Sequence, residues 1–300
     1  MRPATDPDPG ASIRAPGALR TGVLAASAMV AFAANSILCR LALRGGAIDA
    51  ASFSLIRLGS GALMLAAVAA LSRRGPAAGT RRNWMSAFAL FGYAAAFSVA
   101  YLSLGASTGA LILFGSVQAT MLLMGLVAGE RPHPLQWVGL VLALGGLAYL
   151  VSPGLTAPSP TGSVLMAFAG AAWGVYSMRG RGTAGPLRAT ADNFALATVP
   201  AILLALVLLR SLAVTLPGAS LAAASGAITS GLGYVAWYGA VRGLSATRAA
   251  IVQLPVPVIA AAGGVVLLGE TVSARLLLAS IAVLGGVGLA IANRERSTRH

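Results

Sequence analysis

Long apolar runs, separated by short polar segments, make up almost the whole chain. A helix needs about 20 mostly apolar residues to cross the hydrocarbon core of a bilayer. Runs of roughly this length cover residues 21–43, 51–71, 84–104, 107–127, 135–151, 162–178, 192–209, 219–241, 246–268 and 274–292. The pattern therefore predicts an all-α integral membrane protein with ten transmembrane helices.

The stretch of residues 110–150 recurs 140 residues further along the chain without a gap. Gly129-Glu130 aligns with Gly269-Glu270, and Gly145-Gly146 aligns with Gly285-Gly286. Internal repetition of a helical unit is typical of membrane carriers built from structural repeats. The sequence therefore predicts two copies of one membrane module.

Each copy holds five predicted helices, over residues 21–151 and 162–292. Because five is an odd number, the second copy must enter the membrane from the face opposite to the first. Such inverted-topology repeats can open a shared cavity to either side in turn, and secondary transporters use them. Residues 1–20, with several prolines and both signs of charge, are expected to form a disordered tail, and residues 293–300 a second tail.

Composition agrees with a lipid environment. Hydrophobic residues make up 57% of the chain and charged residues 9%, and the mean hydropathy is +0.84. The net charge is +14, but all 21 basic residues are arginines that cluster between the apolar runs rather than along one amphipathic face. We therefore expect membrane lipid, and no nucleic acid, among the partners.

The arginines also predict the orientation. With the N-terminus inside, sixteen of them fall on cytoplasmic segments and four on outer segments, and Arg57 lies within a span. The positive-inside rule then places both termini in the cytoplasm. The absence of lysine is typical of a GC-rich bacterial genome, so we expect the cytoplasmic (inner) membrane of a bacterium.

The two copies, with Gly-Glu before a final Gly-Gly helix, resemble the EamA-type branch of the drug/metabolite transporter superfamily. The second copy matches better, with Leu254-Pro255-Val256-Pro257-Val258 followed by Leu268-Gly269-Glu270-Thr271, whereas the first has Gly115-Ser116-Val117-Gln118 where the family often has proline. The resemblance covers residues 21–292. It implies a ten-helix carrier, and within the branch the chain is similar to exporters of amino acids and aromatic metabolites.

Aromatic residues in the third and eighth runs are candidates for a substrate cavity. Tyr93, Phe97 and Tyr101 share one helical face, and the repeat places Phe97 on Trp237, which lies beside Tyr234 and Tyr238. Two such faces related by the repeat predict facing walls of a central cavity. The alternative is an aromatic belt at the membrane interface, which Tyr101 and Tyr238 suit because they lie near span ends.

Further candidates are polar or amphipathic side chains at membrane depth: Asn35, Gln118, Trp173 and Tyr176. Polar groups in hydrocarbon need partners or water. Contact with substrate and hydrogen bonding between helices are both open for Asn35 and Gln118. Asn35 and Trp173 lie on equivalent helices of the two copies, which favours them as substrate contacts.

Other residues have expected structural roles. Arg57 could bond backbone carbonyls or extend toward the surface, or it could bind a substrate carboxylate. Glu130 and Glu270 are expected to cap the fifth and tenth helices. Pro255 and Pro257 lie in the middle of the ninth run, where they remove two backbone donors and predict a kink that lets the helix flex during gating.

The seven acidic residues and both histidines are predicted in tails, loops or helix ends. Proton-coupled carriers generally use buried carboxylates or histidines, so coupling to an ion gradient is not expected. The same distribution predicts no catalytic residue, no metal site and no cofactor.

We therefore expect a secondary transporter, and not an enzyme, that exports small neutral or zwitterionic metabolites, amino acids and aromatic ones among them. A small-molecule substrate is the expected partner, and the protein is expected to act as a monomer or weak homodimer. Drug or other metabolite efflux by the same fold is the first alternative. A membrane scaffold or receptor subunit without transport is the alternative from another class.

Overall fold

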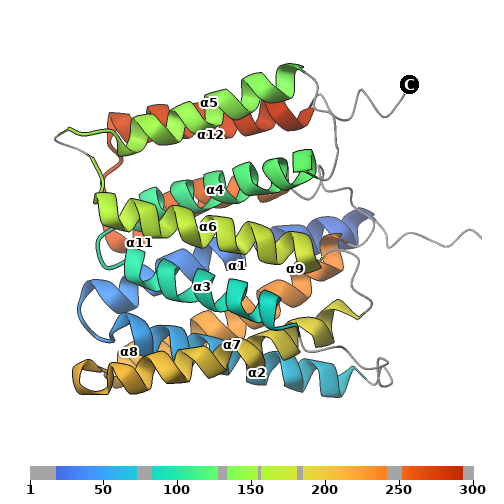
Figure 1. Cartoon of the computed structure of the whole chain (residues 1–300), viewed down its shortest axis with the longest axis vertical. Coiled ribbons are helices and arrows are strands. Elements are labelled where there is room, and N and C mark those ends of the chain that lie inside the picture. Colours follow the sequence, from blue (N-terminus) through green and yellow to red (C-terminus); the bar gives the residue numbers. More distant parts are fainter. Residues whose placement is uncertain are drawn as a thin grey trace, which may run out of the picture.

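The computed structural model describes residues 18–72, 83–127, 134–154, 157–180, 185–241 and 252–292. The described residues form helices and no extended sheet, which confirms the all-α prediction. The helices are α1 (Ala18–Arg44), α2 (Ala50–Leu71), α3 (Trp84–Ala100), α4 (Ala106–Val127), α5 (Pro134–Val151), α6 (Pro160–Gly180), α7 (Pro186–Val207), a short 3-10 turn η1 (Leu209–Ser211), α8 (Leu216–Ala224), the π-helix η2 (Ser225–Leu232), α9 (Gly233–Val241), α11 (Pro255–Leu268) and α12 (Ala274–Ala292). They lie side by side in one bundle (Figure 1).

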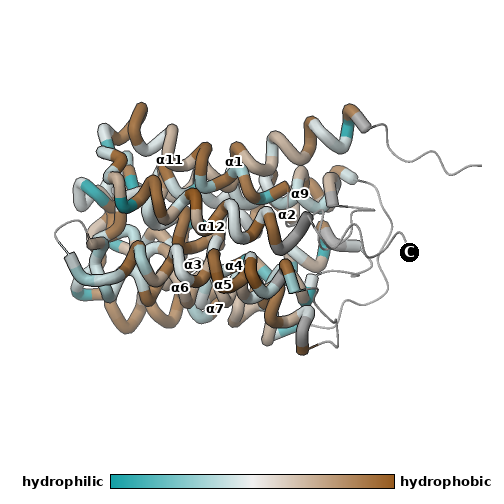
Figure 2. The backbone as a smooth tube through the Cα atoms, turned by 90° about the horizontal axis from the view of Figure 1, so that it is seen from above, coloured by the Kyte–Doolittle hydropathy of each residue, from teal (hydrophilic) through white to brown (hydrophobic). Residues whose placement is uncertain are grey.

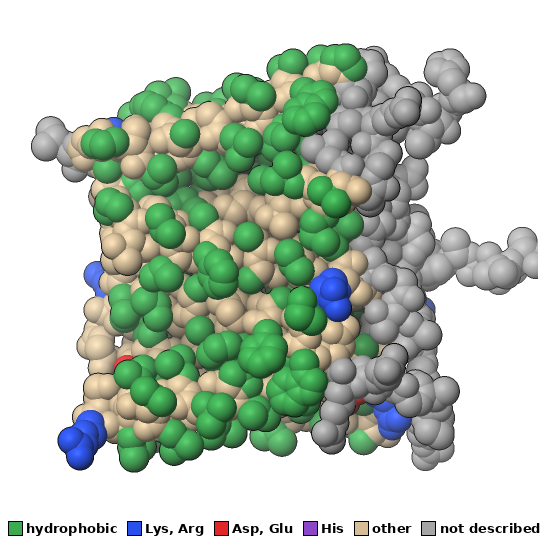
Figure 3. All heavy atoms as spheres, viewed as in Figure 1, with side chains coloured by type: hydrophobic (Ala, Val, Ile, Leu, Met, Phe, Trp, Pro, Cys, Tyr) green, Lys and Arg blue, Asp and Glu red, His purple; other side chains and the backbone are tan. Residues whose placement is uncertain are grey.

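The flanks of the bundle are apolar. By length and composition, four of the described helices could each cross a membrane, over Leu19–Arg44, Ala50–Leu71, Ala106–Gly125 and Leu187–Val207. Hydrophobic colour dominates the middle of many helices in Figure 2. In Figure 3 hydrophobic side chains spread over the visible face, whereas arginines lie toward the two ends. A surface of this kind fits lipid rather than water, as expected for a multi-pass membrane protein.

Helix packing follows the internal repeat. Equivalent helices of the two copies pack on each other: α5 on α12, α2 on α7 and α4 on α11. Contacts between unlike helices also occur in equivalent pairs, since α3 packs on α6 as α1 packs on α9, and α4 packs on α6 as α1 packs on α11. The two copies therefore interlock around an internal two-fold relationship rather than forming two separate domains.

The copies run in opposite directions. Near the end of α1, Arg40 Nη1 donates a 2.8 Å hydrogen bond to the carbonyl of Tyr101, in the turn between α3 and α4. That turn also lies against the start of α6, because a Cβ on Gly162 would meet Ser103 Oγ. The first helix of copy one thus ends where the first helix of copy two begins, as the inverted-topology prediction requires.

The repeated Gly-Gly pair holds α5 and α12 together. A Cβ on Gly146 would lie 2.8 Å from the Cβ of Ala282, and one on Gly286 would lie 2.6 Å from the carbonyl oxygen of Gly139. Gly146 and Gly286 are equivalent residues, so each copy presents a glycine to the other. In lipid, where apolar burial does not drive association, such small residues let helices approach closely.

The structure corrects two boundaries. The third helix ends at Ala100 rather than residue 104, and Arg40 binds the carbonyls of Tyr101 and Leu102 that follow it. The seventh helix starts at Pro186, after Gly185 in the left-handed region (φ 80°), because proline suits a first helical turn. Asp192 therefore lies within α7, exposed, and not at a helix end.

The helix of the ninth run breaks at its prolines, although Leu254 before them keeps helical backbone angles (φ −56°, ψ −34°). Residues 252–253 are helical, Leu254 forms a turn, and α11 begins at Pro255. Proline lacks the N–H that a helix interior needs but is tolerated in the first turn. The equivalent of Pro255 in the first copy is Gly115, and there α4 continues from Ala106 to Val127. A role of Pro255 and Pro257 in gating stays a prediction.

Candidate functional site

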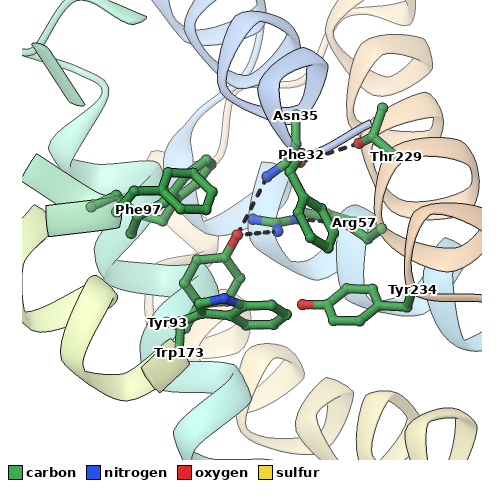
Figure 4. Close-up of a pocket in the computed structure, with 11 residues that line it drawn as sticks. Phe32, Asn35, Arg57, Tyr93, Phe97, Trp173, Thr229 and Tyr234 are labelled. Atoms are coloured by element: carbon green, nitrogen blue, oxygen red, sulfur yellow. Dashed lines mark hydrogen bonds between the residues drawn. The ribbon is translucent and has the colours of Figure 1, made fainter. Parts of the chain in front are cut away.

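A small cavity lies at the centre of the bundle, between the two copies (Figure 4). Side chains from α1, α2, α3, α4, α6, η2 and α9 surround it: Phe32, Asn35, Arg57, Tyr93, Phe97, Leu113, Phe114, Trp173, Thr229, Ser230 and Tyr234. Its volume of about 20 Å³ leaves room for about one water molecule. A cavity of this size is too small for any solute much larger than water.

Asn35 lies at the centre of a buried polar network. Its Oδ1 accepts hydrogen bonds from Ser225 Oγ (2.6 Å) and Thr229 Oγ1 (3.3 Å), and its Nδ2 donates to the Tyr93 hydroxyl (3.4 Å). Asn35 thus joins α1 of the first copy to η2 of the second and to α3. Asn35 therefore bonds between helices and also lines the cavity, and its contact with substrate stays a prediction.

Arg57 lines the same cavity and is 2% exposed. It lies seven residues after the start of α2, at a depth of roughly 10 Å along the helix. Its Nη2 donates to the Tyr93 hydroxyl (2.8 Å) and its Nε to Ser230 Oγ (3.2 Å). The guanidinium carbon lies 4.9 Å from the ring centroids of both Tyr93 and Phe97. Arg57 therefore neither extends to the surface nor bonds a described backbone carbonyl.

The π-helix η2 supplies the polar wall opposite Asn35 and Arg57. Ser225, Thr229 and Ser230 all come from it. It also approaches α2 closely, because a Cβ on Gly226 would collide with the backbone carbonyl of Arg57. A π-helical turn within an α-helix is rare and is frequently found at functional sites. Here it brings three hydroxyl-bearing side chains to the two buried polar residues of the first copy.

Aromatic rings form a connected cluster through the bundle, which we call the ring column. From Tyr101 it passes to Phe97 (4.7 Å between centroids), Tyr93 (5.4 Å) and Trp173 (5.2 Å). It then branches from Trp173 to Tyr176 (5.5 Å) and to Tyr234 (4.9 Å), and Tyr234 leads on to Tyr238 (6.3 Å). The column thus connects the turn after α3 with the region where α6 ends, beside Tyr238.

Five of the aromatic and polar residues selected from the sequence line the cavity: Asn35, Tyr93, Phe97, Trp173 and Tyr234. The other five, Tyr101, Gln118, Tyr176, Trp237 and Tyr238, do not. Tyr101 has no exposed surface, so it does not belong to an interfacial belt. Trp237 packs its ring 5.8 Å from Phe32, behind the cavity wall, so the two predicted walls are not symmetric.

The cavity also contains residues that the sequence analysis did not select: Phe32, Leu113, Phe114, Thr229 and Ser230. Phe32 precedes Asn35 by three residues, so helical spacing from Asn35 could have identified it. The pattern of α-helical spacing could not identify Ser230, because it lies in the π-helix. Within the described residues no cluster of His, Cys, Asp and Glu suits a metal ion.

Glu270 caps a helix, but not the one expected. Its carboxylate accepts hydrogen bonds from the backbone N–H groups of Ala106 (2.6 Å) and Ser107 (3.1 Å) and from Ser107 Oγ (3.0 Å). It therefore caps α4 of the other copy, while Ser273 Oγ accepts from Leu276 N at the start of α12 (3.1 Å). Carboxylates are favoured at a helix N-terminus. Glu130, its equivalent, lies outside the described residues.

The same end of the bundle holds a second link between the copies. Asp49 N donates to the carbonyl of Ala213 (2.8 Å), and Ala213 N donates to Asp49 Oδ2 (3.0 Å). Partial burial raises the pKa of Asp49, but hydrogen bonds from Ser52, Ala213 and Ala51 outweigh it, so the pKa lies below its usual value. Arg44, which donates to the carbonyl of Leu268 (2.5 Å), adds a third link between the copies at this end.

Two inverted helical copies around a central polar and aromatic cavity define the class: a membrane transporter of the drug/metabolite transporter type. The profile of the EamA-like transporter family matches the chain twice, over residues 20–152 and 160–292. The chain belongs to this family.

The chain is similar to two further proteins. The uncharacterized protein PA1977 of Pseudomonas aeruginosa is 52% identical over 275 residues, which cover 92% of this chain and 96% of that protein. A solved structure described as "Crystal structure of protein" superimposes with a TM-score of 0.66 at 20% identity, covering 92% of this chain and 98% of the other. That likeness shows a shared fold.

Proposed function

We propose that this protein exports small neutral or zwitterionic metabolites, amino acids including aromatic ones, by alternating access. The observation that carries the proposal is the central cavity, in which rings of Phe97, Trp173 and Tyr234 surround the hydroxyl and amide groups of Tyr93 and Asn35. A site of this composition can stack on an apolar or aromatic side chain and orient a polar group.

The packing of the copies supports the alternating mechanism. One end of the bundle is closed by Glu270 on α4 and by Asp49 on Ala213, and both links join the first copy to the second. Breaking them, while the copies rock about the glycine contacts of α5 and α12, would open the cavity to that side. We assign this end to the periplasm of a bacterial inner membrane and both termini to the cytoplasm, because sixteen of the 21 arginines fall in the sequence segments predicted on the cytoplasmic side and four in those predicted outside.

Counterflow into proteoliposomes tests the proposal. Vesicles that contain the purified protein are loaded with unlabelled phenylalanine, and uptake of radiolabelled phenylalanine, leucine and serine is followed. We expect transient accumulation of label that protein-free vesicles do not show. The proposal would be contradicted if the protein exchanged none of these amino acids and no other aromatic solute.

A matched pair of variants tests the site. Trp173 lines the cavity, whereas Trp137 is 48% exposed on the outer face of α5. We expect Trp173→Ala to reduce exchange strongly and Trp137→Ala to leave it close to wild type. If the two variants exchanged equally well, the cavity would not be the substrate-binding site.

A further inference from the structure

Arg57 carries a buried charge that the described cavity wall does not neutralise. Among the eleven lining residues it is charged and the other ten are neutral. Its Nε and Nη2 are bonded to the hydroxyls of Ser230 and Tyr93, but its Nη1 is buried and has no hydrogen-bond partner among the described residues. A buried charge without a counter-ion is costly, and so is a buried donor without an acceptor.

The guanidinium is held in place rather than free to move away. Two hydrogen bonds fix it, and the rings of Tyr93 and Phe97 each lie 4.9 Å from its central carbon. Figure 4 shows it beside Tyr93, near the middle of the labelled residues. A planar guanidinium with free N–H groups is suited to a carboxylate.

A second donor lies beside it. The Tyr93 hydroxyl accepts hydrogen bonds from Arg57 and Asn35, so its own O–H remains available to donate. By contrast, Asn35 Oδ1 already accepts two hydrogen bonds, and no carboxylate lines the described cavity to receive an ammonium group. The wall thus offers donors for an anion and rings for an apolar body.

We propose that Arg57, with Tyr93, binds the carboxylate of the transported solute, and that the solute is a small carboxylate with an apolar or aromatic side chain. The proposal rests on the proposed transport function and specifies the group that is recognised: the solute must carry a carboxylate, whereas the ammonium group of an amino acid becomes dispensable. Of the roles that the sequence leaves open for Arg57, the proposal selects the binding of a substrate carboxylate over the structural roles.

The test compares isosteric solutes on the full-length protein. Counterflow of labelled phenylalanine in proteoliposomes is measured in competition with 3-phenylpropionate, which keeps the carboxylate, and with 3-phenylpropionamide, which replaces it by a neutral amide. We expect the carboxylate to compete at least about tenfold better than the amide. Equal competition by the two compounds would overturn the proposal and leave the transport function standing.

Variants of Arg57 provide a second test of the proposal. We expect Arg57→Gln to weaken the apparent affinity for phenylalanine at least about tenfold and to abolish the preference for carboxylate over amide, and Arg57→Lys to retain part of both. Arg210→Gln, at an exposed arginine of η1, serves as the control and should match wild type. A folded Arg57→Gln protein with unchanged affinity would contradict the proposal.

If the wild-type protein shows no counterflow at all, the proposed transport function fails. Carboxylate recognition by Arg57 is then tested separately, by measuring ligand binding. Thermal unfolding of the wild-type protein in detergent should then shift upward with 3-phenylpropionate and not with 3-phenylpropionamide. No shift with either compound, or equal shifts with both, would overturn the assignment of Arg57.

Discussion

The Arg57 guanidinium donates a 2.8 Å hydrogen bond to the Tyr93 hydroxyl, and both side chains line the central cavity. The bond connects α2 to α3 at the wall of the cavity. The polar network of the cavity therefore stabilises the bundle, and under the proposed function it is also the surface that contacts the solute.

Tyr93→Phe removes the acceptor of this bond without removing the ring. We expect a loss of about 1.5–3 kcal/mol of stability, because a charged buried donor loses its partner. The thermal midpoint in detergent measures the effect, and Tyr149→Phe, on the exposed face of α5, is the control. An unchanged midpoint in both variants would show that the bond does not contribute to stability.

The glycine contact between α5 and α12 gives a second prediction. A methyl group at Gly286 would lie 2.6 Å from the carbonyl oxygen of Gly139 and 2.7 Å from Ala143 N, whereas one at Gly285 would meet nothing within 4 Å. We expect Gly286→Ala to destabilise the protein by about 1–3 kcal/mol. Gly285→Ala should be neutral or stabilising by up to about 1 kcal/mol. The reverse order of thermal midpoints would contradict the described packing.

Glu270→Gln tests the link between the copies at the end closed by the α4 cap. The amide offers a single oxygen where the carboxylate accepts three hydrogen bonds, so the cap should weaken by about 1 kcal/mol. This corresponds to roughly fivefold faster hydrogen exchange at the amides of Ala106 and Ser107. Unchanged exchange there would mean that Glu270 does not hold α4.

Asp49 predicts a pH dependence. The pKa of Asp49 is lowered in the folded protein, so its ionised carboxylate contributes to folding stability. This contribution is fully present above the ordinary pKa of about 4 and is lost as the pH falls through the lower pKa of the folded state. We expect acidification below about pH 4 to reduce the stability of wild type more than that of Asp49→Asn. The variant should already be less stable at neutral pH. Parallel pH profiles for the two proteins would contradict this role.

The bundle could be predicted from the sequence because its determinants are local. The length of each apolar run indicates a span, and the recurrence of Gly145-Gly146 as Gly285-Gly286 indicates the repeat. The structure then places Gly146 and Gly286 in the α5–α12 contact. The predicted start of the seventh helix, residue 192, was wrong because the helix begins at Pro186, ahead of the apolar run.

The site could be predicted only in part. Tyr93, Phe97 and Tyr234 were identified from helical spacing and line the cavity. Trp237 does not, because its ring packs 5.8 Å from that of Phe32, behind the cavity wall, and spacing within α9 does not reveal this contact with α1. The place of Arg57 depends on contacts with α3 and η2, which no spacing within α2 reveals.

Alternating access of the central cavity is tested most directly by a single thiol placed in its wall. In a Cys39→Ala background, Ser230→Cys is reacted with a membrane-impermeant maleimide from one side of the membrane at a time, with and without phenylalanine. We expect labelling from both sides, with phenylalanine reducing both labelling rates. Labelling from one side only, unaffected by any transported solute, would contradict alternating access.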